Sequence, residues 1–301
     1  MANVTRTVLD AYLNDVVNPA LAARTHFEGT PLMSTVMSET PWKPGSDTIS
    51  WPVESANSDG TASSEGAGWP AGGARTVAKA VITPQTILAV RHLTGEALSV
   101  GGDLSSLLQT EIDAGMRGLM DAAESYCETE VLDGIDDDTT YAGLTRSTYN
   151  FSSTDTAGGS GALTEAMLDA TSESLQTEGV NLGDCLVFSA HEQRNAYAEI
   201  AGTQYNEHNY VFNADTKGLD LSERGKVIFY AGMPWHAIPG FANTYVVMAE
   251  RGQLLYSWKK RPFVTVHENE SIYGLTLKFA AEIGAYVKNP ARCARISALA
   301  T

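Results

Sequence analysis

The pattern of apolar positions predicts one long helix near the middle of the chain. Residues 101–102 are both glycine and interrupt the preceding segment, and Asp103 is a residue type favoured at an N-cap. Gly115 and Gly118 lie inside the expected helix and each costs about 1 kcal/mol relative to alanine, so we expect a bend or a close backbone approach there. A helix ending at Gly134 would be a rod of roughly 40 to 45 Å. Its apolar positions recur every three or four residues: Leu104, Leu107, Leu108, Ile112, Met116, Leu119, Ala123 and Cys127.

A two-stranded ribbon is predicted ahead of this helix. Residues 48–53 and 76–82 alternate between apolar and polar positions and flank a stretch rich in glycine, serine and proline. An isolated ribbon is marginally stable in water, and the tryptophans Trp42, Trp51 and Trp69 would form an apolar liability on an exposed loop. We therefore expect the ribbon to dock on another surface. The alternative is an ordinary hairpin with a disordered tip on a monomer.

Short helices and strands alternate after the long helix. Thr164 can cap a helix that ends near Gly179, and the apolar run 185–188 reads as a buried strand. A short helix is expected over 191–200, followed by a polar loop and then by apolar runs within 227–248. This alternation indicates an α/β or α+β domain inserted into the chain.

The two ends of the chain have different patterns. Near the C-terminus, extended apolar runs over 261–266 and 279–290 are separated by a polar turn, and Leu275, Leu277 and Phe279 alternate on one face. We expect this face to pack against the long helix. Near the N-terminus, a weak helical pattern over 8–17 is ended by proline, and this arm has too little apolar surface for a core of its own. It must therefore lie on another surface.

The net charge excludes some classes of function. The 301 residues carry 36 acidic and 20 basic side chains, a formal net charge of −16, so the molecule as a whole would be repelled by nucleic acid and by anionic membranes. Proteins that read nucleic-acid sequence depend on clustered Lys and Arg at phosphates. We expect the basic groups at 259–261, Arg292 and Arg295 to pair with carboxylates of this chain or of a neighbour.

Cysteine content and hydropathy bound the compartment. Cys127, Cys185 and Cys293 are odd in number and far apart, so the sequence predicts neither a disulfide framework nor a structural zinc site, and folding in a reducing cytosol fits. The N-terminus lacks a continuous apolar signal region, and no window approaches eighteen unbroken apolar residues. We expect no membrane association.

No motif indicates catalysis or a cofactor. The glycine-rich run 158–162 lacks the Lys and the preceding strand of a phosphate loop. The acidic turn that begins at Asp136 lacks the glycine and glutamate of a calcium loop, so we expect a solvated turn with at most weak divalent binding. The six histidines are not at metal-ligand spacing. Cys185 could pair with His191 or His236 as a nucleophile, but its place in an apolar strand favours a core role. We expect no catalytic residue, metal or cofactor.

The chain resembles the HK97-like major capsid proteins of tailed double-stranded DNA bacteriophages. The resemblance rests on the two C-terminal strands, the long helix and the long Gly/Trp ribbon, in that family's order. It implies an α+β fold in four parts: an N-terminal arm over 1–41, an extended β-hairpin loop over 42–100, a peripheral domain with a long spine helix over 101–149 and 262–301, and an inserted axial domain over 150–261. In the family the arm lies partly on the neighbouring subunit.

The resemblance also implies the function. Copies of the chain are expected to assemble as pentamers and hexamers into an icosahedral shell that encloses the genome DNA without sequence-specific binding. A separate scaffolding protein, a portal and a decoration protein are the expected partners; the virion is the expected location, after assembly in the host cytoplasm. We expect the subunit interfaces to include Trp42, Trp51, Trp69, Lys79, Arg91, Lys259, Lys260, Arg261 and Arg292.

Two other functions stay open at the level of sequence. An encapsulin-like bacterial nanocompartment shares the fold but encloses an enzyme, and packaged DNA rather than protein would distinguish the virus. A monomeric acidic α/β enzyme with an unrecognised site is the alternative from another class. A megadalton particle in light scattering would exclude it.

Overall fold

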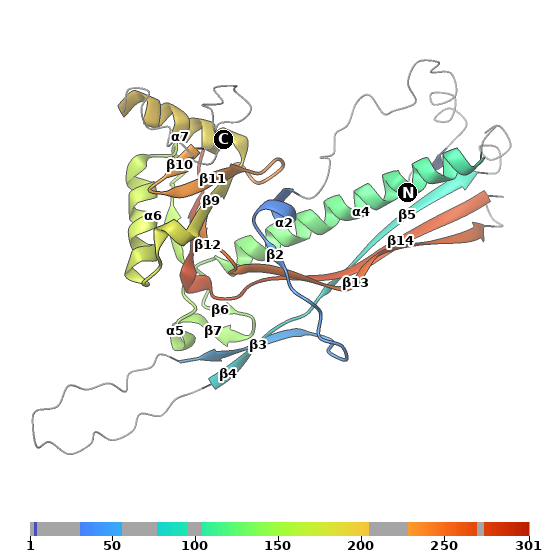
Figure 1. Ribbon diagram of the computed structural model, residues 1–301, viewed down its shortest axis with the longest axis horizontal. Coiled ribbons are helices and arrows are strands. Elements are labelled where there is room, and N and C mark those ends of the chain that lie inside the picture. Colours follow the sequence, from blue (N-terminus) through green and yellow to red (C-terminus); the bar gives the residue numbers. More distant parts are fainter. Residues whose placement is uncertain are drawn as a thin grey trace, which may run out of the picture. The chain divides into compact units, whose positions relative to one another are not determined.

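The computed structural model of the chain divides into two compact units (Figure 1). The first unit contains residues 1–42, 84–130 and 255–285, and the second contains residues 43–83, 131–254 and 286–301. The structure describes residues 3–4, 31–55, 77–94, 104–204, 228–269 and 274–300. The helical pattern over 8–17, Trp69 with the ribbon tip, the residues expected to cap the long helix and the polar loop after 204 therefore lie outside the described residues.

The first unit is built on a five-stranded sheet in the order β1-β5-β14-β13-β2. The central pair β5 and β14 is antiparallel, with Thr94 opposite Gly274 and Gln85 opposite Ile283. The short strands β1 and β2 pair in parallel with β5 and β13. The bounds are β1 Asn3–Val4, β2 Ser38–Glu39, β5 Gln85–Thr94, β13 Leu254–Asn269 and β14 Gly274–Val287.

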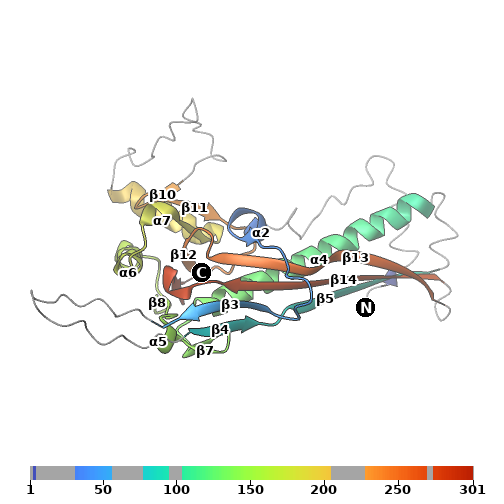
Figure 2. The ribbon, with the colours of Figure 1, turned by 60° about the horizontal axis from the view of Figure 1, so that its bottom comes forward.

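The predicted long helix is present as α4, Leu104–Gly134, and it runs along one face of this sheet (Figure 2). The C-terminal strand packs against it as expected, because Phe279 and Leu277 are buried. A Cβ placed on Gly115 would lie 2.2 Å from the Phe279 ring, so this glycine does allow a close approach. Nothing lies within 4 Å of the same position at Gly118. The buried row of α4 in this unit is Glu111, Gly115, Leu119, Ala123 and Cys127.

This buried row differs in part from the predicted one. Ile112 and Met116 are half-buried, whereas Glu111 and Gly115 are the buried residues at that level. A row with strict four-residue spacing is one of the natural ridges of an α-helix. The ring of Phe279 enters this ridge where a glycine leaves room for it, and this contact selects the row.

The second unit is built on a six-stranded mixed sheet in the order β10-β11-β9-β12-β15-β8. Its helices are α6, Glu165–Thr177, and α7, His191–Gln204. The predicted cap is present, since Thr164 Oγ1 accepts a hydrogen bond from the Met167 amide at 3.4 Å. The strands are β8 Thr154–Ala157, β9 Cys185–Ser189, β10 Ile228–Tyr230, β11 Met233–Ala237, β12 Val246–Glu250 and β15 Cys293–Ser297. The core of this unit includes Leu168, Leu175, Val187, Met233, Trp235, Met248 and Ile296.

The base of the predicted ribbon also belongs to the second unit. Strands β3, Ile49–Glu54, and β4, Val77–Ile82, are antiparallel, with Trp51 opposite Ala80. The ribbon is joined to a small hairpin by a hydrogen bond of 3.0 Å from the Val81 amide to the Ala142 carbonyl. The remaining short elements are α2 Pro31–Thr35, β6 Thr140–Tyr141, β7 Leu144–Thr145, α5 Arg146–Tyr149, η1 Leu182–Asp184 and η2 Pro290–Arg292.

Two segments lie in sheets that the sequence pattern does not indicate. Residues 85–94, grouped with the extended loop from the sequence, form β5 in the five-stranded sheet. The last strand, β15, lies in the six-stranded sheet between β12 and β8. Among the described residues, no helix combines the length and the apolar character that crossing a membrane requires.

Candidate functional site

The basic residues expected at subunit interfaces have carboxylate partners within the chain. In the first unit, Arg91 Nη1 lies 2.9 Å from Glu111 Oε2, and Glu111 is buried. Lys259 and Lys260 both contact Glu282, the former at 3.4 Å. The hydrogen bond from Lys260 lowers the pKa of Glu282, with a smaller contribution from Lys259. The expected ion pairing with the chain's own carboxylates is therefore confirmed for these residues.

Two further pairs lie nearer to solvent. Arg261 Nη2 is 2.7 Å from Glu39 Oε1, with 75% and 38% of the two side chains exposed. In the second unit, Arg292 Nη1 is 2.6 Å from Glu250 Oε1. Exposed pairs of this kind contribute about 0 to 1 kcal/mol to stability. They hold the cations in place without being needed for the fold, so the interface role of these residues stays a prediction.

The tryptophans of the ribbon differ in their surroundings. The Trp51 indole donates a hydrogen bond of 3.0 Å to the Lys288 carbonyl, and its ring centroid lies 4.8 Å from that of Tyr286. Trp51 and Trp42 are half-buried. Lys79, opposite Pro52 on the ribbon, is exposed. The base of the ribbon is thus fastened to the second unit of its own chain.

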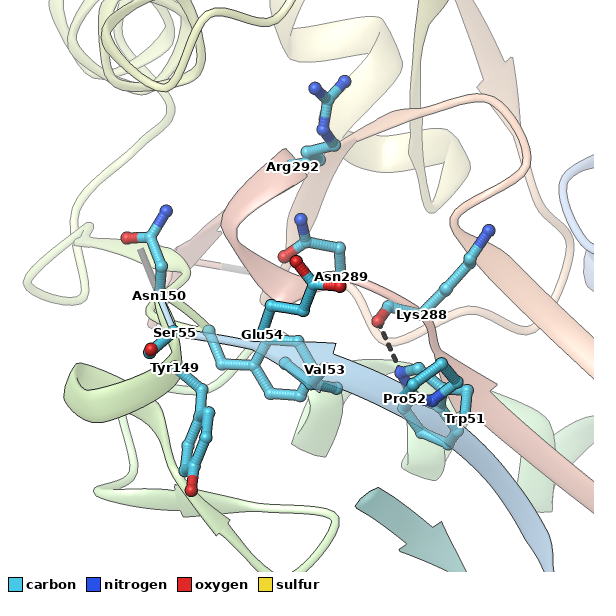
Figure 3. A pocket seen from close by; sticks show the side chains of 11 residues that line it. Trp51, Pro52, Val53, Glu54, Ser55, Tyr149, Asn150, Lys288, Asn289 and Arg292 are labelled. Carbon is cyan, nitrogen blue, oxygen red and sulfur yellow. Dashed lines mark hydrogen bonds between the residues drawn. The ribbon is translucent and has the colours of Figure 1, made fainter. Parts of the chain in front are cut away.

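A recess of about 680 Å³ lies beside β3 in the second unit (Figure 3). Trp51 and Arg292, two predicted interface residues from opposite ends of the sequence, both line it. Glu54, Asn150 and Lys288 add charged and polar groups to its lining. Such a mixed lining suits a polypeptide segment with both apolar and polar side chains better than it suits a small apolar ligand.

Two buried arginines, not predicted as functional residues, bind the C-terminal end of α4. Arg146 donates to the carbonyls of Asp133 at 2.9 Å and Gly134 at 3.0 Å, and Arg295 donates to the Leu132 carbonyl at 2.8 Å. The last carbonyls of a helix have no partner within it and carry the negative end of its dipole. The two guanidinium groups satisfy both needs. A charged residue between Ala294 and Ile296 in an apolar run is the sequence signal of a buried pair.

The acidic turn takes part in this network. Arg295 Nη2 lies 2.8 Å from Asp136 Oδ1 and 2.6 Å from Asp155 Oδ2, which confirms the expected carboxylate pairing of Arg295. Burial opposes ionisation of Asp136, but hydrogen bonds from Asp137 and the charge of Arg295 outweigh it and lower the pKa of Asp136. The neighbouring Asp136 raises the pKa of Asp137.

These three carboxylates are close enough to hold a cation. Ligand atoms of Asp136, Asp137 and Asp155 lie within 4.8 Å of one another. The guanidinium of Arg295 bonds to two of the three, Asp136 and Asp155, and so already supplies positive charge there. We therefore interpret the cluster as an ion-pair network that joins α4, β8 and β15.

The candidate nucleophile Cys185 has the core role that its strand predicts. It opens β9 with no exposed surface, and burial raises the pKa of its thiol to about 11. The thiol is therefore protonated at neutral pH and does not act as a nucleophile. Burial also lowers the pKa of His236, with a smaller effect of Arg251.

Solved structures with the same fold are subunits of particle shells. The capsid asymmetric unit of cyanophage A-1(L) matches with a TM-score of 0.70 and 14% identity, over 95% of this chain and 98% of that one. The capsid of a native GTA particle matches with a TM-score of 0.61 and 13% identity, over 95% and 96%. A structure of Mycobacterium phage Adephagia matches with a TM-score of 0.59 and 12% identity, over 100% and 99%. Among curated proteins, none matches the sequence significantly.

The fold is therefore the HK97-like fold of phage capsid proteins, as the resemblance implied. The sequence itself assigns the family, because the model of the family described as "SU10 major capsid protein" matches residues 18–248, well over half of the chain. The chain belongs to the SU10 major capsid protein family. Its function is that of a capsid protein, and this membership confirms the expected structural, non-enzymatic role.

Proposed function

We propose that many copies of this chain close as pentamers and hexamers into an icosahedral shell around double-stranded DNA, inside the host cytoplasm. The observation that carries this proposal is the family match over residues 18–248. The excess of 16 negative charges per chain supports it, because an acidic subunit would let DNA pack and leave without adhering to the wall. A separate scaffolding protein, a portal and a decoration protein belong to the same proposal.

We propose the following division of labour along the chain. Residues 1–41 act as the arm, 42–100 as the extended loop, 101–149 with 262–301 as the peripheral domain, and 150–261 as the axial domain. The ribbon of β3 and β4, with its tip toward a neighbouring subunit, supports the second assignment. The run of α4 along β14 supports the third.

The recess beside β3 is the interface that the contacts favour most. Trp51 and Arg292 meet there, and the lining offers both ring surface and charged groups to a neighbouring polypeptide. Interfaces concentrate their binding energy in aromatic and arginine side chains of this kind. The other residues proposed for interfaces are Trp42, Trp69, Lys79, Arg91, Lys259, Lys260 and Arg261.

Negative-stain microscopy of the purified chain tests shell formation directly. We expect closed particles from the wild type, containing DNA rather than a protein cargo when they are isolated from infected cells. Deletion of residues 56–72 should leave a soluble, folded subunit that forms capsomers at most, because the ribbon tip is the proposed link across the lattice. A matched variant replaces 56–72 by a Gly/Ser linker of equal length, and it should fail in the same way. Shells of wild-type form from either variant would contradict the role of the ribbon, and a monomer as the only wild-type species would contradict shell formation.

A further inference from the structure

A second row of apolar side chains on α4 lies beside its buried row. Leu108, Ile112, Met116 and Met120 follow one another at four-residue spacing, and all four are half-buried. Each is three residues from a member of the buried row, which makes the two rows neighbours on the helix surface. Four large apolar side chains in one line need a covering surface.

The chain enters this part of the first unit at one end of the row. Phe279, opposite Ala89, contacts α4 at Gly115, and two residues further along β5 Arg91 bonds to Glu111. Two residues of strand therefore correspond to one turn of helix, so Leu93 lies level with Leu108 to within about one turn. Val4 of β1 is the strand partner of Leu93. Figure 1 shows the end of β5 and the start of α4 at the same end of the unit.

The chain is fixed again at the other end of the row. Glu124, one turn beyond Met120, accepts hydrogen bonds from the amides of Leu32 and Met33 at the start of α2, the latter at 3.2 Å. Both of these residues are buried. Residues 5–30 therefore connect two points on α4 that are about 24 Å apart along the helix axis, at 1.5 Å per residue.

The connecting segment has the pattern that this row requires. Its apolar residues recur at helical spacing over 8–17, and Asn18-Pro19 ends the pattern. A ten-residue helix is about 15 Å long, close to the length of about 18 Å from Leu108 to Met120. Residues 19–30 are more than enough to reach α2. Because both ends are anchored in the same unit, the effective concentration of the segment at its own α4 is high.

We propose that residues 8–17 form an amphipathic helix that docks on Leu108, Ile112, Met116 and Met120 of the same chain. The contact does not depend on shell formation. It makes this part of the arm a component of the subunit core. In the family that the sequence resembles, the arm lies partly on the neighbouring subunit instead. The facing apolar residues of the segment are Val8, Leu9, Tyr12, Leu13, Val16 and Val17.

Paired cysteines in the full chain test this contact and its direction. Leu13→Cys is combined with Ile112→Cys or with Met116→Cys, and a short bismaleimide is added; the native cysteines are at most 1% exposed and do not interfere. The control pair combines Leu13→Cys with Arg117→Cys, because Arg117 is exposed on another side of α4. We expect efficient linkage within single chains from either first pair at any dilution, and little from the control. Equal linkage from the control, or none from either pair, overturns the proposal.

Mass spectrometry of mixed isotopically labelled and unlabelled chains distinguishes linkage within one chain from linkage between chains. Links that join labelled to unlabelled chains, and that form only in assembled particles, would place the segment on a neighbouring subunit and overturn the proposal.

Methionine oxidation gives a second readout that does not depend on the cross-linker. In the wild type we expect slow oxidation of Met116 and Met120 by hydrogen peroxide, and a several-fold faster reaction in a Leu9→Ser, Leu13→Ser double variant. Met248, with no exposed surface, is the internal control for global unfolding and should stay protected in both. The polar-face variant Asn14→Ser should behave as the wild type. Unchanged oxidation of Met116 and Met120 in the double variant overturns the proposal.

Discussion

At the residue scale, the buried arginines show how a strongly acidic chain uses its few cations. Arg146 and Arg295 are 3% and 7% exposed, and both donate to the end of α4. A buried charge is costly unless it is paired and hydrogen-bonded, and here carbonyls and carboxylates together meet that requirement. The two residues therefore belong to the structural framework of the second unit and are not available to bind DNA.

The first residue-scale prediction concerns Arg295→Ala. The substitution leaves the carboxylate of Asp155 buried without its partner, so we expect the free energy of unfolding to fall by about 3 to 5 kcal/mol. Urea denaturation of the unassembled subunit measures it. Arg251→Ala, at an exposed arginine, is the matched control and should change stability by about 0.5 kcal/mol or less. A loss below about 1 kcal/mol for Arg295→Ala would show that the network is solvated.

The second prediction at this scale concerns the thiols. All three cysteines are free and buried, and burial raises their pKa values. We expect no reaction with a thiol reagent at pH 8 in the folded subunit and three equivalents per chain after unfolding in guanidinium. Rapid modification of any cysteine without loss of structure would mean that the surrounding core opens readily.

At the element scale, two glycines three residues apart in α4 have opposite roles. Gly115 admits the ring of Phe279, which is 1% exposed and has no space to move into. Gly118 is exposed, with nothing near its Cβ position. The same residue type therefore reports a tight contact at one position and only a helix-weakening residue at the other. The sequence alone assigns both glycines the same expectation.

The prediction from this contrast uses the two alanine substitutions as a matched pair. Gly115→Ala should destabilise the subunit by about 1 to 3 kcal/mol through overpacking, partly offset by a gain of about 1 kcal/mol in helix propensity. Gly118→Ala should stabilise it by about 1 kcal/mol. Thermal unfolding measures both effects, and adding Phe279→Leu should partly restore the Gly115→Ala variant. Equal effects at the two positions would contradict the contact.

At the scale of the whole molecule, charge is the property that assembly must overcome. Each chain carries a net charge of −16, and bringing many copies together is costly unless cations face carboxylates across interfaces or counterions screen them. The pairs of Lys259, Lys260, Arg261 and Arg292 keep these cations near the surface of their units.

We therefore expect assembly to be favoured by moderate salt or divalent cations, as measured by light scattering. Reversal of the charge at Lys259, Lys260, Arg261 and Arg292 together should reduce assembly while leaving the subunit folded, because exposed pairs contribute about 0 to 1 kcal/mol each. The control reverses four exposed cations outside the proposed interfaces: Lys43, Arg117, Arg251 and Lys278. Equal loss of assembly in both variants would indicate an effect of total charge alone.

The sequence by itself determined the elements whose signal is local. The helix that ends at Gly134, the strands of the ribbon and the helix capped by Thr164 follow from the spacing of consecutive residues, because periodicity and capping depend only on near neighbours. Tertiary structure decided which row of α4 is buried, since this depends on where the ring of Phe279 meets Gly115. It also decided the partners of Arg295, because Asp136 and Asp155 are more than a hundred residues away and only the pairing of β15 with β8 brings them together.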